Sequence, residues 1–348
     1  MDNSRKIEIL NSLSQVFKGI VEPQFKLPST LEEYRNKGLE LIEETQYHNP
    51  WFITDAIKKA LRIWGDALEA DKVEKWLKGY KNQSKGKKVG VIMAGNIPLV
   101  GLHDALVVLA SDNYLIAKLS SKDFQLMNFV LNVLSSISEE WKAKIKIGEK
   151  LKNIDILIAT GSDNSARYFE YYFRDKTKII RKNRTSVALI NGDESTEDLK
   201  GLASDVFSYF GLGCRNVTKI FLPKGYNKDL LFEAFFDYKE IINHNKYANN
   251  YDYNKAIYLL EKVDLLDNGF LLLKEDKGLH SPVGVLYYEE YKSLDKVYQL
   301  LEEQSENIQC IVSKNLKKQH VYFGDTQNVG LWDYADKIDT MKFLDQTH

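Results

Sequence analysis

The sequence predicts a parallel, doubly wound α/β fold, and two observations lead to this prediction. First, Lys88 to Ala94 form a continuous apolar run, which is typical of a strand covered on both faces. Second, strand-like and helix-like segments alternate from there through most of the remaining chain. This alternation is expected of βαβ units, in which helices cover both faces of a parallel sheet.

The expected elements follow in chain order, after a mainly helical region at residues 1–84 that prolines punctuate. Pro98 is well placed at the first turn of a helix. The expected helices are 98–110, 124–137, 163–172, 196–210, 227–239 and roughly 247–263. The expected strands are 88–94, 114–119, 154–159, 187–190 and 217–222, with further strands near 270–274, 283–288 and 308–313.

The chain has 348 residues, which is enough for two domains of ordinary size. Its net charge of −1 and its scattered lysines give no reason to expect nucleic acid as a partner. No apolar run approaches the roughly 18 residues of a membrane helix, and no signal peptide is visible. Two cysteines provide neither a disulfide framework nor the spacing of a zinc site. We therefore expect a soluble, cytoplasmic protein with no membrane partner and no metal.

Cys214 lies on a glycine-bracketed turn between an amphipathic helix and a buried strand. A thiol in such a turn can face a cleft, where a neighbouring Arg215 would favour the nucleophilic thiolate. The alternative is a cysteine that fills space in the core, as free cysteines usually do. Gly213 and the polar neighbours argue against that alternative for Cys214. The core-filling alternative suits Cys310, which lies within the apolar run of residues 308–312.

Three turns that follow expected strands carry polar residues, and each has a structural alternative. Asn96 could donate to a developing oxyanion or simply cap the next helix. Lys118, at the edge where open α/β sheets bind ligands, could contact a ribose or phosphate, or only reach into solvent. Gly161 and Ser162 open a helix, so they could bind a phosphate or form a plain cap. The dinucleotide fingerprint G-x-G-x-x-G is absent.

Two histidines are candidate acids or bases, although packing or surface positions are the ordinary alternative. His103 lies on the helix after Asn96, and His280 precedes Ser281-Pro282 in a turn that could face a cleft. A Ser-His-Asp hydrolase has little support, because no G-x-S-x-G elbow is present.

The order of these features resembles the aldehyde dehydrogenase superfamily. There, the amide of an Asn-Phe-Pro motif lines the oxyanion hole, and the lysine of Lys-Pro-Ser-Glu binds the adenosine ribose. The serine of Thr-Gly-Ser caps the helix at the pyrophosphate, and the nucleophile follows in Gly-Gln-x-Cys. The residues that match are Asn96 in Gly95-Asn96-Ile97-Pro98, Lys118 with Ser120 after the second strand, Thr160-Gly161-Ser162, and Cys214 in Gly211-Leu212-Gly213-Cys214.

The chain is most similar to the acyl-CoA reductase branch related to the LuxC fatty acid reductase of bacterial luminescence. The resemblance covers residues 88–348 and includes the tail, whereas the first 80 or so residues carry little of it. Two motifs depart from the superfamily. No carboxylate stands at 180–183, where hydrolytic members carry their general-base glutamate, and Glu-x-Phe-Gly-Pro is replaced by residues 278–282. Without the first glutamate water is poorly activated, which favours exchange of the acyl group with a thiol.

The resemblance implies an aldehyde dehydrogenase-like fold of two doubly wound domains. A Rossmann-like dinucleotide-binding domain with a helical N-terminal region is expected at 1–183, and a catalytic domain at 184–324. A C-terminal segment, 325–348, is expected to return to the first domain or to serve oligomerisation. It also implies that NADPH or NADH reduces an acyl-CoA, with a fatty acyl group expected, to an aldehyde through a Cys214 acyl-enzyme. His280 is a candidate proton donor.

The expected partners are the acyl-CoA substrate, an acyl-transferring enzyme and further copies of the chain. Two alternatives remain open at this point. One is acyl transfer or thioester hydrolysis through Cys214 without a hydride step. The other is a non-catalytic nucleotide-binding subunit of an acyl-processing complex.

Overall fold

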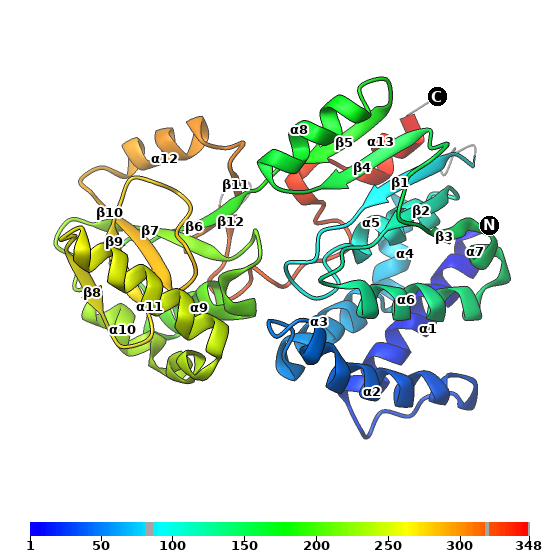
Figure 1. Cartoon of the computed structure of the whole chain (residues 1–348), viewed down its shortest axis with the longest axis horizontal. Helices are drawn as coiled ribbons and strands as arrows, with labels where there is room; N and C mark the ends of the chain where they lie inside the picture. Colours follow the sequence, from blue (N-terminus) through cyan, green and yellow to red (C-terminus); the bar gives the residue numbers. More distant parts are fainter. Residues whose placement is uncertain (81–85, 317–319, 347–348) are drawn as a thin grey trace. The chain divides into compact units, whose positions relative to one another are not determined.

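The computed structural model describes residues 1–80, 86–316 and 320–346, and its chain forms two compact units (Figure 1). Unit 1 comprises Met1–Asn183 and Val329–His348, and unit 2 comprises Arg184–Asn328. Each unit contains a mainly parallel sheet, so the predicted fold class is confirmed. Residues 81–84 of the expected helical region lie outside the described residues. Within the described ranges, every helix is too short or too polar to traverse a lipid bilayer.

Unit 1 is built on a five-stranded sheet in the order β3-β2-β1-β4-β5, with every pair parallel. The central strand β1 places Val89 opposite both Leu115 and Ile156. The chain moves outward from β1 to β3 and then restarts on the other side at β4, so the strand order reverses between β1 and β4. The strands are β1 Lys88–Ile92, β2 Tyr114–Lys118, β3 Ile145–Ile147, β4 Ile156–Thr160 and β5 Thr177–Arg181.

The helices of unit 1 form because apolar residues recur at helical spacing. In α1, for example, Ile9, Leu13, Phe17 and Ile20 fall on one buried stripe. That stripe is part of the core that α1 shares with α2, α3, α4 and α6. The helices are α1 Asn3–Val21, α2 Glu32–His48, α3 Thr54–Ala67, α4 Ala70–Lys78, α5 Leu102–Ala110, α6 Phe124–Ile137, α7 Glu139–Lys144, α8 Asp163–Tyr172 and α13 Thr340–Gln346.

The segment after residue 328 packs on unit 1. His103 on α5 makes a hydrogen bond between its Nε2 and the carbonyl of Leu331 at 2.9 Å. The His103 ring lies beside those of Trp64, Trp76 and Tyr334, and burial lowers the pKa of the imidazole. His103 is therefore a packing residue, the ordinary alternative for a histidine at that position.

Unit 2 contains a seven-stranded sheet in the order β12-β11-β6-β7-β10-β9-β8, in which only the edge pair β8–β9 is antiparallel among the described pairs. Ala188 of β6 (Thr185–Leu189) and the following Ile190 join one hydrophobic core, while Val187 and Leu189 of β6 join a second, so both faces of the sheet are covered. Its elements are β6 Thr185–Leu189, α9 Thr196–Phe207, β7 Val217–Pro223, α10 Asp229–Phe235, α11 Asn245–Leu260, β8 Leu265–Asp267, β9 Leu272–Glu275, β10 Val285–Tyr291, α12 Leu294–Glu303, β11 Ile308–Val312 and β12 His320–Val321.

Three expected helix boundaries are wrong. The helix expected at 227–239 is α10 Asp229–Phe235, which continues as a 3₁₀ helix at Phe236–Asn243. The helix after Asn96 begins at Leu102 rather than at Pro98, because residues 98–101 form a turn in which Leu99 has a left-handed backbone (φ 58°). The helix expected to reach residue 210 ends at Phe207. The segments β3, β5, β8, β12, α7, α12 and α13 are not among the expected elements. All but α12 are short, whereas α12 is amphipathic, with Val297 and Leu301 on its buried face.

Candidate active site

Unit 1 gathers six of the predicted site residues along one edge of its sheet. Asn96 follows β1, Lys118 ends β2 with Ser120 two residues later, and Thr160 ends β4 before Gly161 and Ser162. These three strands are parallel neighbours in the order β2-β1-β4, so their carboxyl ends meet. The strand order reverses between β1 and β4, and open α/β sheets bind their ligands in the crevice at such a point.

The turn after β4 is shaped around Gly161 and Ser162. The Ser162 side chain caps α8 by accepting the Ser165 N–H at 3.3 Å. A Cβ added to Gly161 would lie 2.9 Å from Cβ of Ser165 and 3.0 Å from a ring carbon of Phe169, so only glycine allows this close approach. Ser162 is exposed at the start of a ten-residue helix, where the dipole favours an anion.

The lysine and serine after β2 differ in exposure. Lys118 is exposed, and its carbonyl accepts the N–H of Met93 at 3.0 Å, which continues the pairing of β1 with β2 toward Asn96. Ser120 is half-buried, and its Oγ accepts the N–H of Lys122. Asn96 is half-buried between these strand ends.

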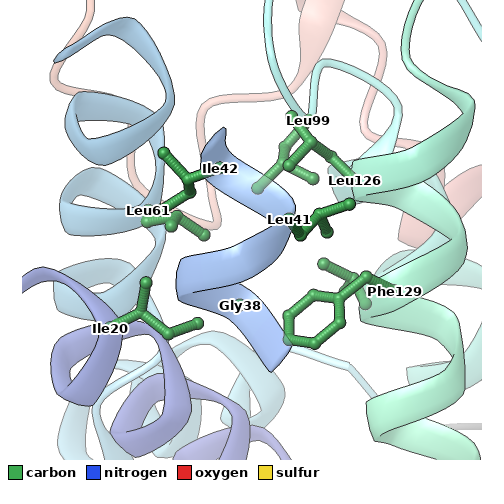
Figure 2. Close-up of a pocket in the computed structure, with 9 residues that line it drawn as sticks. Ile20, Gly38, Leu41, Ile42, Leu61, Leu99, Leu126 and Phe129 are labelled. Carbon is green, nitrogen blue, oxygen red and sulfur yellow. The ribbon is translucent and has the colours of Figure 1, made fainter. Parts of the chain in front are cut away.

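Behind the Asn96 turn lies a small apolar pocket (Figure 2). Leu99 points into it from the turn, and the other walls come from α1, α2, α3 and α6. The cavity of about 10 Å³ has room for one water molecule at most, so this is a packed core rather than a ligand site. The labelled lining residues are Ile20, Gly38, Leu41, Ile42, Leu61, Leu99, Leu126 and Phe129.

Unit 2 holds Cys214 on an exposed position of a tightly held turn. Three consecutive residues before it, Tyr209, Phe210 and Gly211, have left-handed backbones with φ of 52°, 58° and 76°. Left-handed backbone is unfavourable for large side chains and persists where surrounding contacts impose it. Asn216 supplies such contacts.

Asn216 is fully buried, and its side chain bonds the backbone on both sides of this kink. Its Oδ1 accepts the N–H of Gly213 at 2.8 Å. Its Nδ2 donates to the carbonyls of Ser208 at 2.8 Å and Asp205 at 3.0 Å, and makes a longer contact of 3.4 Å with that of Val206. These carbonyls belong to the last turn of α9 and the residue after it, where a helix leaves its acceptors without internal donors. The Asn216 amide therefore ends the helix and sets the course of the chain toward Cys214.

The Cys214 turn is also held by hydrogen bonds to β6 and to the segment around Thr326. Ser186 on β6 donates from Oγ to the Cys214 carbonyl at 3.1 Å, and the same Oγ lies 3.0 Å from Sγ of Cys310. Cys310 is buried, and burial raises the pKa of its thiol, as the core interpretation of this residue requires. Arg215 donates from Nε to the carbonyl of Thr326 at 2.6 Å, so this guanidinium anchors the turn to a neighbouring segment.

The loop of His280 precedes β10, the strand beside β7, and His280 is exposed. Thr218, at the start of β7, donates to the carbonyl of Leu279 at 2.6 Å, which ties this loop to the strand that follows Cys214. Phe210 from the Cys214 turn and Ser281 from the His280 loop line one cavity of about 30 Å³. Both candidate residues of unit 2 therefore lie on loops at the same edge of one sheet.

Arg181 lies within residues 180–183, where the resemblance to hydrolytic aldehyde dehydrogenases leads us to expect a glutamate. It ends β5 and is buried, with its guanidinium paired to Oδ2 of Asp104 and donating to Oγ1 of Thr340 at 2.9 Å. The Asp104 carboxylate is thus engaged by a buried cation. No local signal identifies this pair, because Arg181 ends a short strand that reads Thr-Lys-Ile-Ile-Arg, and an arginine at such a position is ordinarily exposed.

Comparisons with known proteins agree with this architecture. A family model described as "Acyl-CoA reductase (LuxC)" matches residues 7–231. No curated protein matches the sequence. The NAD⁺ complex of an aldehyde dehydrogenase from Bacillus cereus aligns with 91% of this chain and 73% of that chain, at 12% identity and a TM-score of 0.61. An acetylating aldehyde dehydrogenase from Geobacillus thermoglucosidasius aligns with 90% of this chain and 76% of that chain, at 11% identity and a TM-score of 0.60.

These structural similarities show that the fold is aldehyde dehydrogenase-like, as predicted. The family match begins at residue 7, so it includes the N-terminal helices, where we expected little resemblance. It ends at residue 231, before the tail on which the predicted resemblance also depended. Because the match spans more than half of the sequence, the chain belongs to the acyl-CoA reductase (LuxC) family.

Proposed function

We propose that the protein reduces an acyl-CoA thioester to an aldehyde, with a fatty acyl group as the expected substrate. One observation carries the proposal: a chain of the acyl-CoA reductase family presents an exposed cysteine, Cys214, on a turn fixed by a buried amide. A space-filling cysteine needs no such presentation, since free cysteines are ordinarily buried, as Cys310 is here.

Cys214 is the proposed nucleophile. Its thiolate forms a bond to the thioester carbonyl carbon, and the bond from that carbon to the CoA sulfur breaks, so that CoA leaves as a thiol after taking a proton. The proposed donors to the oxyanion are the Asn96 amide and the Cys214 backbone N–H. One such donor typically contributes about 2.7–4 kcal/mol to the stability of the transition state. His280 is the proposed proton donor.

The residues at the carboxyl edge of the unit 1 sheet fit a nicotinamide dinucleotide. We assign Ser162, Gly161 and Thr160 to the pyrophosphate, because the glycine allows close backbone approach and the helix start favours an anion. Lys118 and Ser120 would hold the adenosine ribose. Once bound, reduced nicotinamide would supply a hydride to the carbonyl carbon of the Cys214 thioester. The bond from that carbon to Cys214 Sγ would then break, which releases the aldehyde and regenerates the thiolate. Similar structures that contain NAD⁺ support this assignment.

Arg181 favours acyl exchange with a thiol over hydrolysis. Arg181 cannot act as a general base, because its guanidinium stays protonated. Its partner Asp104 is held in the ion pair. Residues 180–183 therefore contain no carboxylate to serve as the general base that activates water in hydrolytic aldehyde dehydrogenases. We propose acyl-CoA, or an acyl-transferring partner enzyme, as the acyl donor, and a homo-oligomer as the working form.

The test mixes the protein with acyl-CoAs of graded chain length and either NADPH or NADH. The proposal predicts loss of nicotinamide absorbance that depends on acyl-CoA, an aldehyde product, and no activity in Cys214→Ala. Cys310→Ala is the matched control, and we expect it to keep the activity. Release of CoA without nicotinamide oxidation would indicate acyl transfer or hydrolysis instead. Absence of both signals at every chain length would contradict an enzymatic role.

A further inference from the structure

Asp123 is a buried carboxyl group that makes an unusual long-range contact. It stands at the N-cap position of α6, but its side chain makes no capping hydrogen bond there. Instead its Oδ2 accepts the backbone N–H of Leu99 at 2.8 Å, although the two residues are 24 positions apart. Asp123 is 2% exposed, and its other oxygen has no hydrogen-bond partner within the described ranges. Burial raises the pKa of Asp123 well above its usual range.

Residues 120–123, which include Asp123, also contact Gly95, the residue just before Asn96. A Cβ added to Gly95 would lie 2.4 Å from Oγ of Ser120 and 3.2 Å from Cβ of Asp123, so Gly95 rests directly on the chain that follows β2. Gly95 and Leu99 bracket Asn96 at distances of one and three residues. The turn that carries Asn96 is therefore held at both ends by residues 120–123.

Leu99 is the anchor of this turn. Its backbone is left-handed (φ 58°), which a leucine adopts only under constraint. The constraint has two parts: Asp123 holds the N–H, and the fully buried side chain fills the pocket between the N-terminal helices and α6 (Figure 2). Asn49, just after α2, also donates from Nδ2 to the carbonyl of Lys122 at 3.0 Å, which secures the segment that carries Asp123.

We propose that Asp123 is a positioning residue that acts through Leu99 to hold Asn96 in place for oxyanion binding. The role of Asn96 belongs to the proposed function, so this inference deepens that function. The proposal also assigns a role to the N-terminal helices α1, α2 and α3, because the Leu99 side chain packs against them. Preorganisation matters here, since a displacement of about 1 Å in a positioned group can cost roughly a hundredfold in rate.

The test combines acylation kinetics with amide hydrogen exchange. Asp123→Ala removes the acceptor, and we expect a 10- to 100-fold slower acylation of Cys214 by acyl-CoA and faster exchange of the Leu99 amide. Asp123→Asn keeps an oxygen acceptor and should recover most of the lost rate and protection. Asp175→Ala, at an exposed position in the same unit, is the control. It should change neither the acylation rate of Cys214 nor the exchange rate of the Leu99 amide. Should Asp123→Ala fail to fold, Asp123→Ser replaces it, because a serine hydroxyl is too short to reach the Leu99 N–H.

A double-mutant cycle separates positioning from general destabilisation. If Asp123 acts through Asn96, Asp123→Ala in an Asn96→Ala background should slow acylation by less than about threefold. Equal slowing in both backgrounds, or an unchanged Leu99 exchange rate in Asp123→Ala, would overturn the inference. The exchange measurement needs no substrate. It therefore still tests the Asp123 contact if the wild type forms no acyl adduct, a result that would refute the proposed function alone.

Discussion

Replacing Asn216 by alanine should both destabilise unit 2 and slow the reaction of Cys214. The substitution removes the acceptor of the Gly213 N–H and the donor to the carbonyls of Ser208 and Asp205. All four residues are buried, so water does not readily replace the lost partners. The left-handed residues of the turn then lose the contact that imposes their backbone.

The size of the effect follows from the groups left without partners. A buried polar group that loses its partner costs about 1–3 kcal/mol, and such costs are not fully additive within one network. We therefore expect the free energy of unfolding to fall by about 3 kcal/mol. For a unit of this size, this corresponds to a melting temperature lower by roughly 6–12 °C. The misplaced turn should also slow acylation of Cys214 by roughly tenfold or more.

Thermal melting and rapid mixing with acyl-CoA measure these two effects. Asn243→Ala is the matched control, because Asn243 is an exposed asparagine of the same unit whose side chain bonds only its neighbour Glu240 among the contacts described. Asn243→Ala should leave the melting temperature and the acylation rate of Cys214 unchanged. If Asn216→Ala melted within 2 °C of the wild type and acylated at the wild-type rate, the account of how this turn is held would be wrong.

Two further predictions concern titratable groups of unit 2. Iodoacetamide at pH 8 should label Cys214 and spare Cys310, because Cys310 is buried and burial raises its thiol pKa; equal labelling by peptide mass spectrometry would refute this. Burial raises the pKa of Asp205 to about 6 from 3.8. Its stabilising contribution is complete below about pH 4 and is lost as the pH rises through about 6. Between pH 5 and pH 8 the wild type should therefore lose about 1.4 kcal/mol more unfolding free energy than Asp205→Asn, and parallel pH profiles from denaturant titration would contradict the assignment.

The strands that position the candidate site could be predicted from local sequence. The β1 and β4 segments are continuous apolar runs, and the carboxyl ends of parallel strands must meet at one edge. The alternation predicts Lys118 at the sheet edge where ligands bind, whereas the strand order is what brings Asn96 and Ser162 to the same edge. By contrast, β5 reads Thr-Lys-Ile-Ile-Arg, which is too short and too polar at its ends to be separated from a loop.

The end of α9 could not be predicted, because a distant side chain decides it. Tyr209 and Phe210 continue the apolar pattern of the helix, so periodicity extends it to residue 210. The observed end depends on Asn216, which takes up the carbonyls of the last turn from beyond the cysteine. In the local sequence, Asn216 is only a polar neighbour of Cys214. Its burial was the missing fact.

Asp123 escaped prediction for a similar reason. An aspartate just before an apolar helical pattern is usually a cap, which a local reading favours. The partner of its carboxyl is a backbone N–H on a different βα turn, brought close only because β1 and β2 are neighbours in the sheet. Contacts of this kind depend on topology and are invisible to spacing along the chain.

The most direct test of the central claim is a single-turnover experiment followed by intact mass. The protein is mixed with excess acyl-CoA in the absence of nicotinamide, and its mass is measured before and after NADPH or NADH is added. The account predicts a gain of one acyl group, located on the peptide that contains Cys214 and absent from Cys214→Ala. Reduced nicotinamide should then remove this group as aldehyde. An unmodified protein, an adduct on another residue, or an adduct that is released only as free acid would contradict the claim.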